Sequence, residues 1–591
     1  MCGIAGQFGR LGPGFAERAR TGLRHRGPDS SGVWQAGHAC LVHTRLAILD
    51  LSEGGAQPML YETPAGRAVL VFNGEIYNYR ELRAELIAQG ETFTSESDTE
   101  VLLRLLLRDG VRALPRLAGM FAFAFWREDT GTALLARDAL GIKPLYYRLC
   151  PDGLTFASET RVLRPPGAER AAPDPVVVRD FLLWGSVPEP ATLQGEVRQL
   201  PAGHWLEWRA DRVTQESWFQ LRLGAPPPPI DPVRTTREAL RESIRRHLVS
   251  DVPVGLFLSG GIDSTAVLAL TREALGPSAD LRTFSIGFAD PEFDESGLAR
   301  RTASHFGTQH TEWRMTAAEG AEEIAGFLAA MDQPTLDGFN TWCVSKLARR
   351  AGVKVVLSGL GGDELFAGYN SFDRVPAFRR WHRRLGGLRH WAALALDQCA
   401  PGSRFRRLAA FCRSEGGWLA AYHAQRGIFT AAEAAQLTEV LTGQHPAAPD
   451  WALPGLPTDP RDVVSHLELT RYMRNQLLRD SDVFSMAHGL ELRVPFVDSR
   501  LLNTLATIPA RLRLQPGKQL LLDAVPEIPA WIRNQPKRGF RFPFQAWMEG
   551  SFAHRLEAAA RQSPVPLETW YRRWALAALL HTLSPASAPR A

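Results

Sequence analysis

The sequence has few cysteines and none of the spacings that usually pair them. Six cysteines occur among 591 residues, at positions 2, 40, 150, 343, 399 and 412, and there is no Cys-x-x-Cys. This scatter argues against a disulfide framework and against a zinc site. The chain also lacks an apolar run of about 18 residues, which a membrane-spanning helix needs. It opens on Met-Cys-Gly-Ile, without a basic, hydrophobic signal peptide. We therefore expect a cytoplasmic protein with no membrane span.

An excess of charge of one sign is also missing. The chain has 68 Lys and Arg against 63 Asp and Glu, a formal net charge of +5. The arginine clusters at 379–384 and 404–407 are more typical of solvated helix faces than of a stripe that binds nucleic acid. The composition is that of an ordinary globular protein, and 591 residues are too many for one core. We expect two or more domains and no nucleic-acid partner.

Four consecutive prolines, Pro226 to Pro229, separate two kinds of sequence. Before them, short strand-like runs alternate with two predicted helices, Tyr79–Gln89 and Asp98–Arg108, and Ser97 is a plausible N-cap for the second. This mixture predicts an α+β sandwich. After them, long helices alternate with short apolar strands at 256–258, 283–288 and 354–357, a pattern typical of a parallel α/β sheet. We predict domains at 1–215 and 233–591, joined by a proline-rich linker at 216–232.

The stretch Leu256-Phe-Leu-Ser-Gly-Gly-Ile-Asp-Ser264 reads as a strand, a glycine turn and the start of a helix. This order directs backbone N–H groups and a helix N-terminus at one point, which suits a phosphate. Gly260 and Gly261 allow close approach to the main chain. Ser259 and Ser264 add hydroxyl donors, and Asp263 could hold a Mg²⁺ ion that bridges phosphates. No Gly-Lys-Ser/Thr follows, so the loop is not a Walker A motif.

Cys2 is a second candidate site. Removal of Met1 would give this residue a free α-amino group beside its own thiol, and the amine could act as the base that activates the nucleophile. The motifs that follow in order are His25-Arg-Gly-Pro-Asp29, His43-Thr-Arg-Leu46, Phe72-Asn-Gly-Glu-Ile-Tyr-Asn78 and Ser97-Asp-Thr-Glu100. With Cys2 they resemble a class II glutamine amidotransferase domain of the N-terminal-nucleophile type, over residues 1 to about 210. The resemblance implies that Cys2 attacks the side-chain amide of glutamine.

The same resemblance assigns the residues around the nucleophile. Arg45 pairs its planar guanidinium with the α-carboxylate of glutamine. Glu75 and Asp98 hold the α-ammonium group. Asn73 and the backbone N–H of Gly74 stabilise the oxyanion of the tetrahedral intermediate.

The second half is identified by its loops. The glycine turn at 259–264 resembles the SGGxDS pyrophosphate loop of the ATP pyrophosphatases. Together with Thr283–Phe288, Leu357–Phe366, Ser485–Phe496 and Pro536–Phe540, it makes the whole chain resemble glutamine-hydrolysing asparagine synthetase. The implied fold is the sandwich followed by an adenine-nucleotide hydrolase-like α/β sheet with added helices. The implied reaction uses ATP to adenylate the β-carboxylate of aspartate, after which ammonia from glutamine displaces AMP.

This resemblance also implies the residues of the second site. Asp263 and Asp363 match the Mg²⁺ ligands, and Lys518 matches a catalytic lysine beside the adenylate. Lys537 and Arg538 are further candidates for phosphate contact. The ATP contacts are expected at Leu258, Ser259, Gly260, Gly261, Asp263, Ser264, Ile286, Ser358 and Gly359.

Two departures from the family pattern concern the acceptor. The loop that usually reads Ser-Gly-Glu-Gly is Ser358-Gly-Leu-Gly361, so Leu360 replaces a carboxylate, and the common Lys-x-Asp-Arg-Met-Ser-Met is Asp480-Ser-Asp-Val-Phe-Ser-Met486. Aspartate remains the acceptor that the resemblance implies, with another carboxylate in secondary metabolism or envelope polysaccharide synthesis as the alternative. Cys2 argues against a β-lactam synthetase-like cyclase, and two largely complete catalytic constellations argue against an inactive regulatory protein. The expected partners are glutamine, ATP and the acceptor; a homodimer stays open.

Overall fold

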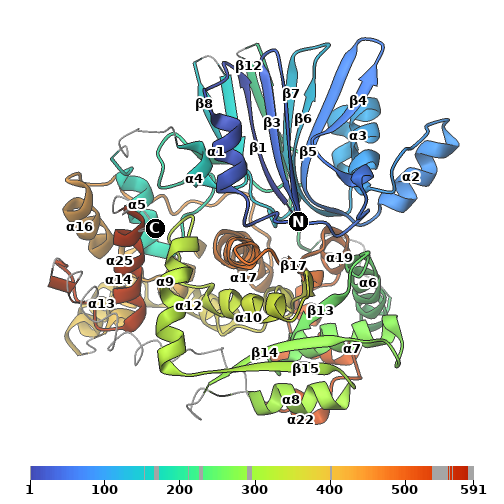
Figure 1. Ribbon diagram of the computed structural model, residues 1–591. Helices are drawn as coiled ribbons and strands as arrows, with labels where there is room; N and C mark the ends of the chain where they lie inside the picture. Colours follow the sequence, from blue (N-terminus) through green and yellow to red (C-terminus); the bar gives the residue numbers. More distant parts are fainter. Residues whose placement is uncertain are drawn as a thin grey trace.

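The computed structural model describes residues 2–151, 153–164, 172–210, 212–224, 230–288, 294, 296–399, 402–535, 557, 560–561 and 563–583. The four prolines at 226–229 and the motif 536–540, with Lys537 and Arg538, lie outside these residues. Figure 1 shows a sandwich of two antiparallel sheets standing against a second unit, in which helices surround a parallel sheet. The predicted fold class is confirmed.

Each layer of the sandwich has six strands. The first sheet has the order β10-β8-β9-β1-β3-β2 and the second β12-β11-β7-β6-β5-β4. The strands of the first are β1 (Cys2–Gly9), β2 (Ser30–Ala36), β3 (Ala39–Arg45), β8 (Tyr146–Cys150), β9 (Gly153–Ala157) and β10 (Arg198–Gln199). Those of the second are β4 (Met59–Thr63), β5 (Gly66–Ile76), β6 (Gly119–Arg127), β7 (Thr132–Arg137), β11 (His204–Arg209) and β12 (Arg212–Ser217).

Strand β6 explains why this half packs as layers. Successive side chains of a strand point to opposite faces. Phe121, Phe123 and Phe125 pack on one face, in a core shared with helices α2 and α3, while Ala122, Ala124 and Trp126 pack on the other, in the core between the sheets. A strand that is buried on both faces needs cover on both sides, and the helices supply the outer one.

The first half contains five α-helices within the described residues, and the two that the sequence predicts, at 79–89 and 98–108, end within one residue of the observed α2 and α3. The five are α1 (Phe15–Gly22), α2 (Tyr79–Ala88), α3 (Asp98–Asp109), α4 (Thr160–Leu163) and α5 (Pro175–Trp184). The Ser97 hydroxyl accepts a hydrogen bond from the backbone N–H of Thr99 at 3.1 Å, which confirms Ser97 as the N-cap of α3.

The second unit contains a five-stranded parallel sheet. Its order is β15-β14-β13-β16-β17, and every adjacent pair is parallel. The strands are β13 (Val254–Phe257), β14 (Arg282–Phe288), β15 (Gln309–Met315), β16 (Val355–Leu357) and β17 (Glu491–Arg493). The chain leaves β13 toward β14 on one side and later returns as β16 on the other. Ligands of open α/β sheets bind at such a switch point, outside the carboxyl ends of the strands.

Helices cover this sheet and extend beyond it. The first six in chain order are α6 (Pro232–His247), α7 (Ile262–Leu275), α8 (Ser296–His305), α9 (Ala317–Ala330), α10 (Phe339–Arg350) and α11 (Gly362–Leu365). The others are α12 (Ser371–Leu385), α13 (Arg389–Cys399), α14 (Ser403–Arg413), α15 (Trp418–Arg426), α16 (Ala431–Thr442), α17 (Pro460–Leu467), the π-helix η4 (Glu468–Leu478), α18 (Arg479–Met486), α19 (Ser499–Leu505), α20 (Ala510–Arg513), α21 (Gln519–Ala524), α22 (Ala530–Arg533) and α25 (Trp570–Leu583). Within the described ranges, no helix is long and apolar enough to cross a bilayer.

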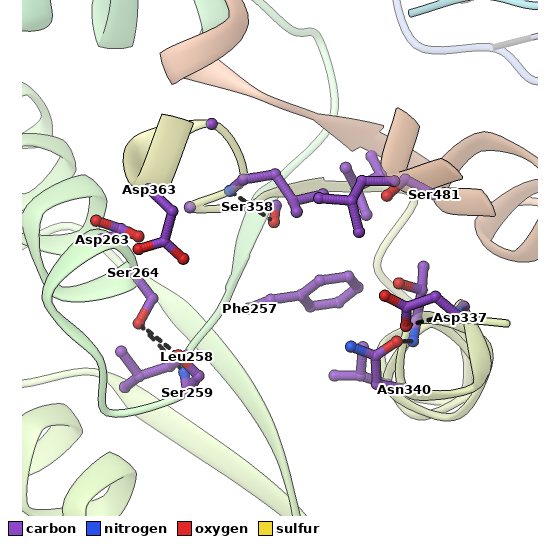
Figure 2. A pocket seen from close by; sticks show the side chains of 18 of the residues that line it. Phe257, Leu258, Ser259, Asp263, Ser264, Asp337, Asn340, Ser358, Asp363 and Ser481 are labelled. Carbon is purple, nitrogen blue, oxygen red and sulfur yellow. Dashed lines mark hydrogen bonds between the residues drawn. The ribbon is translucent and has the colours of Figure 1, made fainter. Parts of the chain in front are cut away.

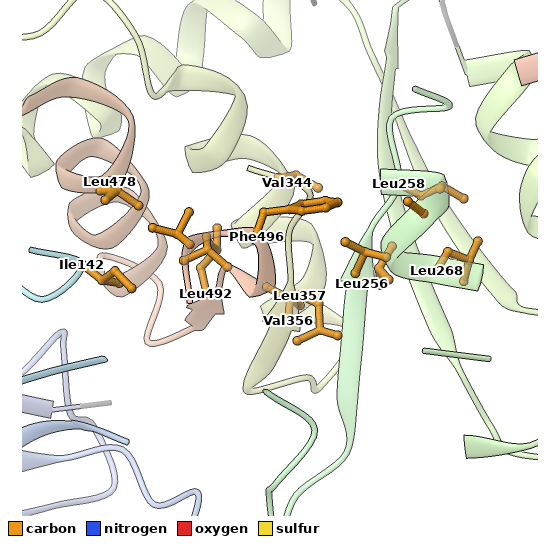
Figure 3. Packing of buried hydrophobic residues seen from close by; sticks show 14 of the residues in the cluster. Ile142, Leu256, Leu258, Leu268, Val344, Val356, Leu357, Leu478, Leu492 and Phe496 are labelled. Carbon is orange, nitrogen blue, oxygen red and sulfur yellow. The ribbon is translucent and has the colours of Figure 1, made fainter. Parts of the chain in front are cut away.

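An apolar cluster joins the two halves. Ile142 and Met120 of the sandwich belong to the same buried cluster as Leu478, Leu492 and the strands of the parallel sheet. Figure 3 shows Ile142 at the end of this cluster that holds Leu478 and Leu492. The two halves therefore share one core where they meet.

A buried ionic group lies in the same interface. The Arg26 guanidinium donates to the Asp482 carboxylate at 2.6 Å, and the Lys143 ammonium lies 3.3 Å from the other Asp482 oxygen. All three side chains are almost fully buried. Arg26 also donates to Glu159 at 3.2 Å. Because no water can replace these partners, each charge depends on the others for its stability.

We expect Asp482→Asn to lower the stability of the protein by about 3 kcal/mol, because it leaves buried cations with a weaker acceptor. Urea denaturation followed by tryptophan fluorescence measures this loss. Glu238→Gln is the control, since Glu238 pairs with Arg234 on an exposed helix face and should unfold like wild type. Equal midpoints for Asp482→Asn and wild type would contradict the prediction.

Candidate active sites

The N-terminal cysteine lies at the end of the sandwich that faces the second unit, where Figure 1 places the start of the chain. Cys2 begins β1 and stands opposite Arg45 of β3 in the strand register. Its backbone nitrogen donates a hydrogen bond to Asn73 Oδ1 at 3.0 Å. Burial raises the pKa of the Cys2 thiol, so the thiol needs a base close by to become a nucleophile. The amine released by removal of Met1 would be that backbone nitrogen.

Asn73 and Gly74 have the features of an oxyanion hole. The Asn73 Nδ2 group is buried and has no acceptor among the described residues. Gly74 has φ 153°, and a Cβ there would lie 2.0 Å from the Met120 carbonyl oxygen, so only glycine fits. A buried donor without a partner beside a nucleophile suits an oxygen that becomes negative during reaction.

The residues predicted to bind the glutamine backbone lie around the same end of the sandwich. The Arg45 guanidinium donates to the carbonyl oxygens of Ser52 (2.9 Å) and Asp50, which holds it in one orientation. The Asp98 carboxylate accepts the backbone N–H of Ile76 at 2.9 Å, and burial raises its pKa to about 6. Glu75 lies 3.5 Å from Arg493 of the second unit. The predicted glutamine site therefore borders directly on the other half.

Residues of this border had no assigned role in the sequence analysis. Arg26 Nε donates to the carbonyl oxygen of Cys2 at 3.2 Å while its other nitrogens bind Glu159 and Asp482. Arg493 bonds Glu491 at 2.5 Å and contacts Glu75. Arg26 is part of the His25–Asp29 motif and Arg493 of the Ser485–Phe496 motif, so the motifs marked them, but only the fold shows that they meet across the interface.

The glycine turn after β13 and the loop after β16 come together at the switch point of the sheet. Ser259 and Ser264 hydrogen-bond through their hydroxyls at 3.1 Å. Lys518 Nζ lies 2.5 Å from Asp263 Oδ2 and 2.5 Å from Asp363 Oδ1. Although burial alone would lower it, the two carboxylates raise the pKa of Lys518. Three residues separated by 100 or more positions in the sequence thus form one ionic cluster.

The side chains of this cluster lie so close to the neighbouring backbone that two positions beside them have no room for a side chain. A Cβ at Gly368 would lie 1.8 Å from Asp363 Oδ1 and 2.5 Å from Lys518 Cε. A Cβ at Gly362 would lie 2.4 Å from the Asp263 carboxyl carbon. Lys518 itself has φ 60°, a left-handed conformation that costs energy for a residue with a side chain. Strain of this kind is typical of functional sites.

A cavity of about 430 Å³ opens beside these carboxylates. We call it the ATP cavity, after the ATP contacts predicted to line it. Figure 2 shows Asp263, Asp363, Ser259 and Ser264 at one end, Asp337, Asn340 and Ser481 at the other, and the Phe257 ring between them. Of the predicted ATP contacts, the lining includes Leu258, Ser259, Asp263, Ser264, Ile286, Ser358 and Gly359. Gly260 and Gly261 follow in the same turn but do not line the cavity. Leu360 does, as do Glu364 and Asp480.

The two carboxylates fit a magnesium ion bound together with a nucleotide. In the described part of the chain, no group of three or more His, Cys, Asp or Glu is placed to enclose a metal. Mg²⁺ is commonly held by one or two carboxylates and by substrate phosphates, with water in its other positions. Asp263 and Asp363 offer two hard oxygen donors at the mouth of the glycine turn, so they suit a metal that arrives with ATP.

Comparison with known proteins gives a family match for each half of the chain. Residues 235–589 match the sequence model of the family described as asparagine synthase. The chain belongs to this family. Residues 1–219 match the glutamine amidotransferase domain. The chain is similar to asparagine synthetase [glutamine-hydrolyzing] 1 of Bacillus subtilis, with 32% identity over 569 residues, 93% of this chain and 88% of that protein. It is similar to asparagine synthetase B of Escherichia coli, with 33% identity over 434 residues, 68% and 71% respectively.

We expect Cys2→Ala to abolish release of glutamate from glutamine and to leave synthesis from ammonium salts unchanged, because Cys2 and the ATP cavity belong to separate units. Glutamate and pyrophosphate are measured in parallel assays. Cys40→Ala is the control, because Cys40 is a buried core cysteine on β3. Mass spectrometry should show that Met1 is absent from active protein. Glutamate release by Cys2→Ala at the wild-type rate would remove Cys2 from the mechanism.

We expect Asp263→Asn and Asp363→Asn each to reduce pyrophosphate release at least 100-fold with either nitrogen source, because each change removes an anionic ligand for the metal. Glutaminase activity should persist. The control is Asp373→Asn, which changes an exposed acid on α12. Normal ATP turnover in both variants would rule out the metal role.

Proposed function

We propose that the protein hydrolyses glutamine at Cys2 and uses the ammonia to amidate a carboxylate that it has first joined to AMP. The overall reaction converts carboxylate, glutamine and ATP into amide, glutamate, AMP and pyrophosphate. One observation carries the proposal: Arg26 contacts both the Cys2 carbonyl and Asp482, and the helix of Asp482 lines the ATP cavity through Asp480 and Ser481. The two predicted sites are thus joined through one helix.

At the first site, the α-amine of Cys2 takes the thiol proton and the sulfur attacks the glutamine amide carbon. The Asn73 amide and the Gly74 N–H are aligned to stabilise the oxyanion. The α-ammonium group of Cys2 gives that proton to the departing nitrogen, and ammonia leaves as the C–N bond breaks. A water molecule then releases glutamate from the thioester and restores the thiol. Arg45 and Asp98 orient the substrate backbone, which places its amide next to the thiol.

At the second site, a carboxylate oxygen attacks the α-phosphorus of ATP, and pyrophosphate departs. This step is needed because oxide is a very poor leaving group, whereas AMP is a good one. Lys518 stabilises negative charge as the phosphates separate. A magnesium ion, when bound, would neutralise part of the pyrophosphate charge. Ammonia then attacks the acyl carbon, AMP leaves, and the ammonium proton passes to a base or to water.

L-Aspartate is the acceptor suggested by the family, and a different carboxylate is the alternative. Leu360 lines the cavity and also packs against the apolar core, so this part of the wall accepts neither a proton nor a hydrogen bond. A wall of this kind favours a bulkier or less charged acceptor than free aspartate. The intact features of both sites argue against an inactive protein. The cytoplasmic location and the homodimer remain predictions.

The proposal is tested by measuring pyrophosphate release with ATP, Mg²⁺ and ammonium over a panel of carboxylates. A carboxylate that raises this release and is recovered as its amide would support the reaction. If none does so while the protein binds ATP, the reaction assigned here is wrong. Parallel measurement of glutamate release tests the first site separately.

We expect aspartate to be a modest substrate of wild type and Leu360→Glu to raise its kcat/KM about tenfold, because the carboxylate supplies a proton acceptor in the cavity wall. Leu360→Gln is the control, since it is polar and of similar size but cannot act as a base near neutral pH. If wild type amidates aspartate as efficiently as a standard asparagine synthetase and Leu360→Glu adds nothing, the replacement is neutral.

A further inference from the structure

A second cavity of about 190 Å³ lies next to the ATP cavity and was not suggested by any motif. Its walls come from the segment after α5, from α15 and from the π-helix η4. Tyr472 lines both cavities, so they lie on two sides of one side chain. A volume of 190 Å³ is small for a whole drug-sized ligand and suits one group of a larger molecule.

Three arginines lie around the second cavity, and two of them form ion pairs with carboxylates. Arg426 binds Glu468 through two nitrogens, at 2.9 and 3.1 Å, and Arg474 pairs with Glu189 at 3.1 Å. Arg471 also lines the cavity, yet no carboxylate in the described part of the chain lies within ion-pair distance of it. Burial lowers the pKa of Arg471, although the more distant carboxylates of Asp180 and Glu189 oppose this effect in part. An anion in the cavity would offset this cost.

Gln476 gives an independent indication of a polar ligand. Its side chain lines the cavity, is only 6% exposed, and makes no hydrogen bond to any residue that the structure describes. Buried amides are normally hydrogen-bonded. An amide donor beside an unpaired guanidinium is a suitable arrangement for the oxygens of a carboxylate or phosphate.

The aromatic and cationic side chains around the second cavity contact one another. Arg426 lies 4.1 Å from the centre of the Tyr472 ring and 4.3 Å from that of Tyr369, a residue of the ATP cavity. Trp184 stacks on Tyr422 with 6.0 Å between ring centres. Arg471, Tyr472 and Gln476 all belong to η4, and π-helical segments occur often at functional sites. Tyr472 and Arg426 thus connect the two cavities.

We propose that the second cavity binds an anionic group, a carboxylate or a phosphate, through Arg471 and Gln476, and that this group is the far end of the acceptor. The proposal rests on the proposed function, since it assumes that the acceptor carboxylate reacts in the ATP cavity. It gives the acceptor a chemical class: an elongated acid with a second anionic group. Arg471 is then a residue that determines specificity rather than one that takes part in the chemistry.

Direct binding tests the site. Thermal unfolding of the full-length protein is followed with increasing inorganic phosphate or glutarate, while a non-hydrolysable ATP analogue with Mg²⁺ fills the nucleotide site. We expect wild type to be stabilised and Arg471→Gln to bind the anion about tenfold or more weakly, because hydrogen bonds to a charged group are lost. Arg471→Lys should keep part of the binding. Arg245→Gln, an exposed arginine on α6, is the charge-matched control and should bind like wild type.

Anion binding that is absent from wild type, or that is unchanged in Arg471→Gln, would overturn the site. Arg471→Gln that loses binding but keeps wild-type glutaminase activity would show that the variant is folded and that the effect is local.

Steady-state kinetics test whether the bound anionic group belongs to the acceptor or to a separate ligand. Unbranched dicarboxylates are compared with their monomethyl esters in ammonium-dependent pyrophosphate release. We expect wild type to prefer the dicarboxylate about tenfold in kcat/KM, and Arg471→Gln to lose this preference through KM alone. Added phosphate should compete with the dicarboxylate in wild type.

Phosphate that changes the rate without competing would identify a separate effector and overturn the link to the acceptor. If no acceptor releases pyrophosphate while Arg471-dependent anion binding persists, the site stands and the proposed reaction fails.

Discussion

The buried carboxylate of Asp482, shared by Arg26 and Lys143, is the interaction on which the arrangement of the molecule depends. A carboxylate without exposure to water is stable only where cations stand close to it. Here the cations come from the sandwich, and the carboxylate comes from a helix of the second unit. Because none of the three charged groups is stable without its partners, the two halves are held in one orientation relative to each other. This orientation keeps Cys2, through Arg26, close to the helix that borders the ATP cavity.

Charged side chains are also paired at the second site, but there the pairing leaves a net negative charge. Asp263 and Asp363 are held together by Lys518, and glycines at 362 and 368 let their carboxylates approach the backbone. Two acids and one base leave a net negative charge at the mouth of a glycine turn that offers N–H donors. A cation would neutralise the negative charge, and a polyphosphate would accept hydrogen bonds from the N–H donors. These features suit a metal ion that binds together with a nucleotide better than a metal ion bound by protein groups alone.

In our proposal, the two cavities divide the recognition of the acceptor. The ATP cavity is acidic at both ends and has an apolar wall at Leu360, whereas the second cavity is lined by Arg426 and Arg471. Tyr472 and Arg426 lie between them and are restrained by ring and ion-pair contacts. Such separation lets one end of a substrate react while the other end provides binding energy and selectivity.

Local sequence was enough for the elements and for the list of candidate residues. The alternation in β6, the Ser97 cap and the apolar runs of the parallel sheet depend on neighbours within a few positions, so their helices and strands were predicted closely. Cys2, Asp263, Asp363 and Lys518 were proposed from motifs that resemble those of a known family, and their roles remain predictions. Tertiary structure alone decided that Lys518 stands between the two aspartates, that Arg26 reaches Asp482, and that Arg471 and Gln476 share a cavity with Trp184. These contacts join positions tens to hundreds of residues apart, and no local pattern reports which buried charges will find a partner and which will not.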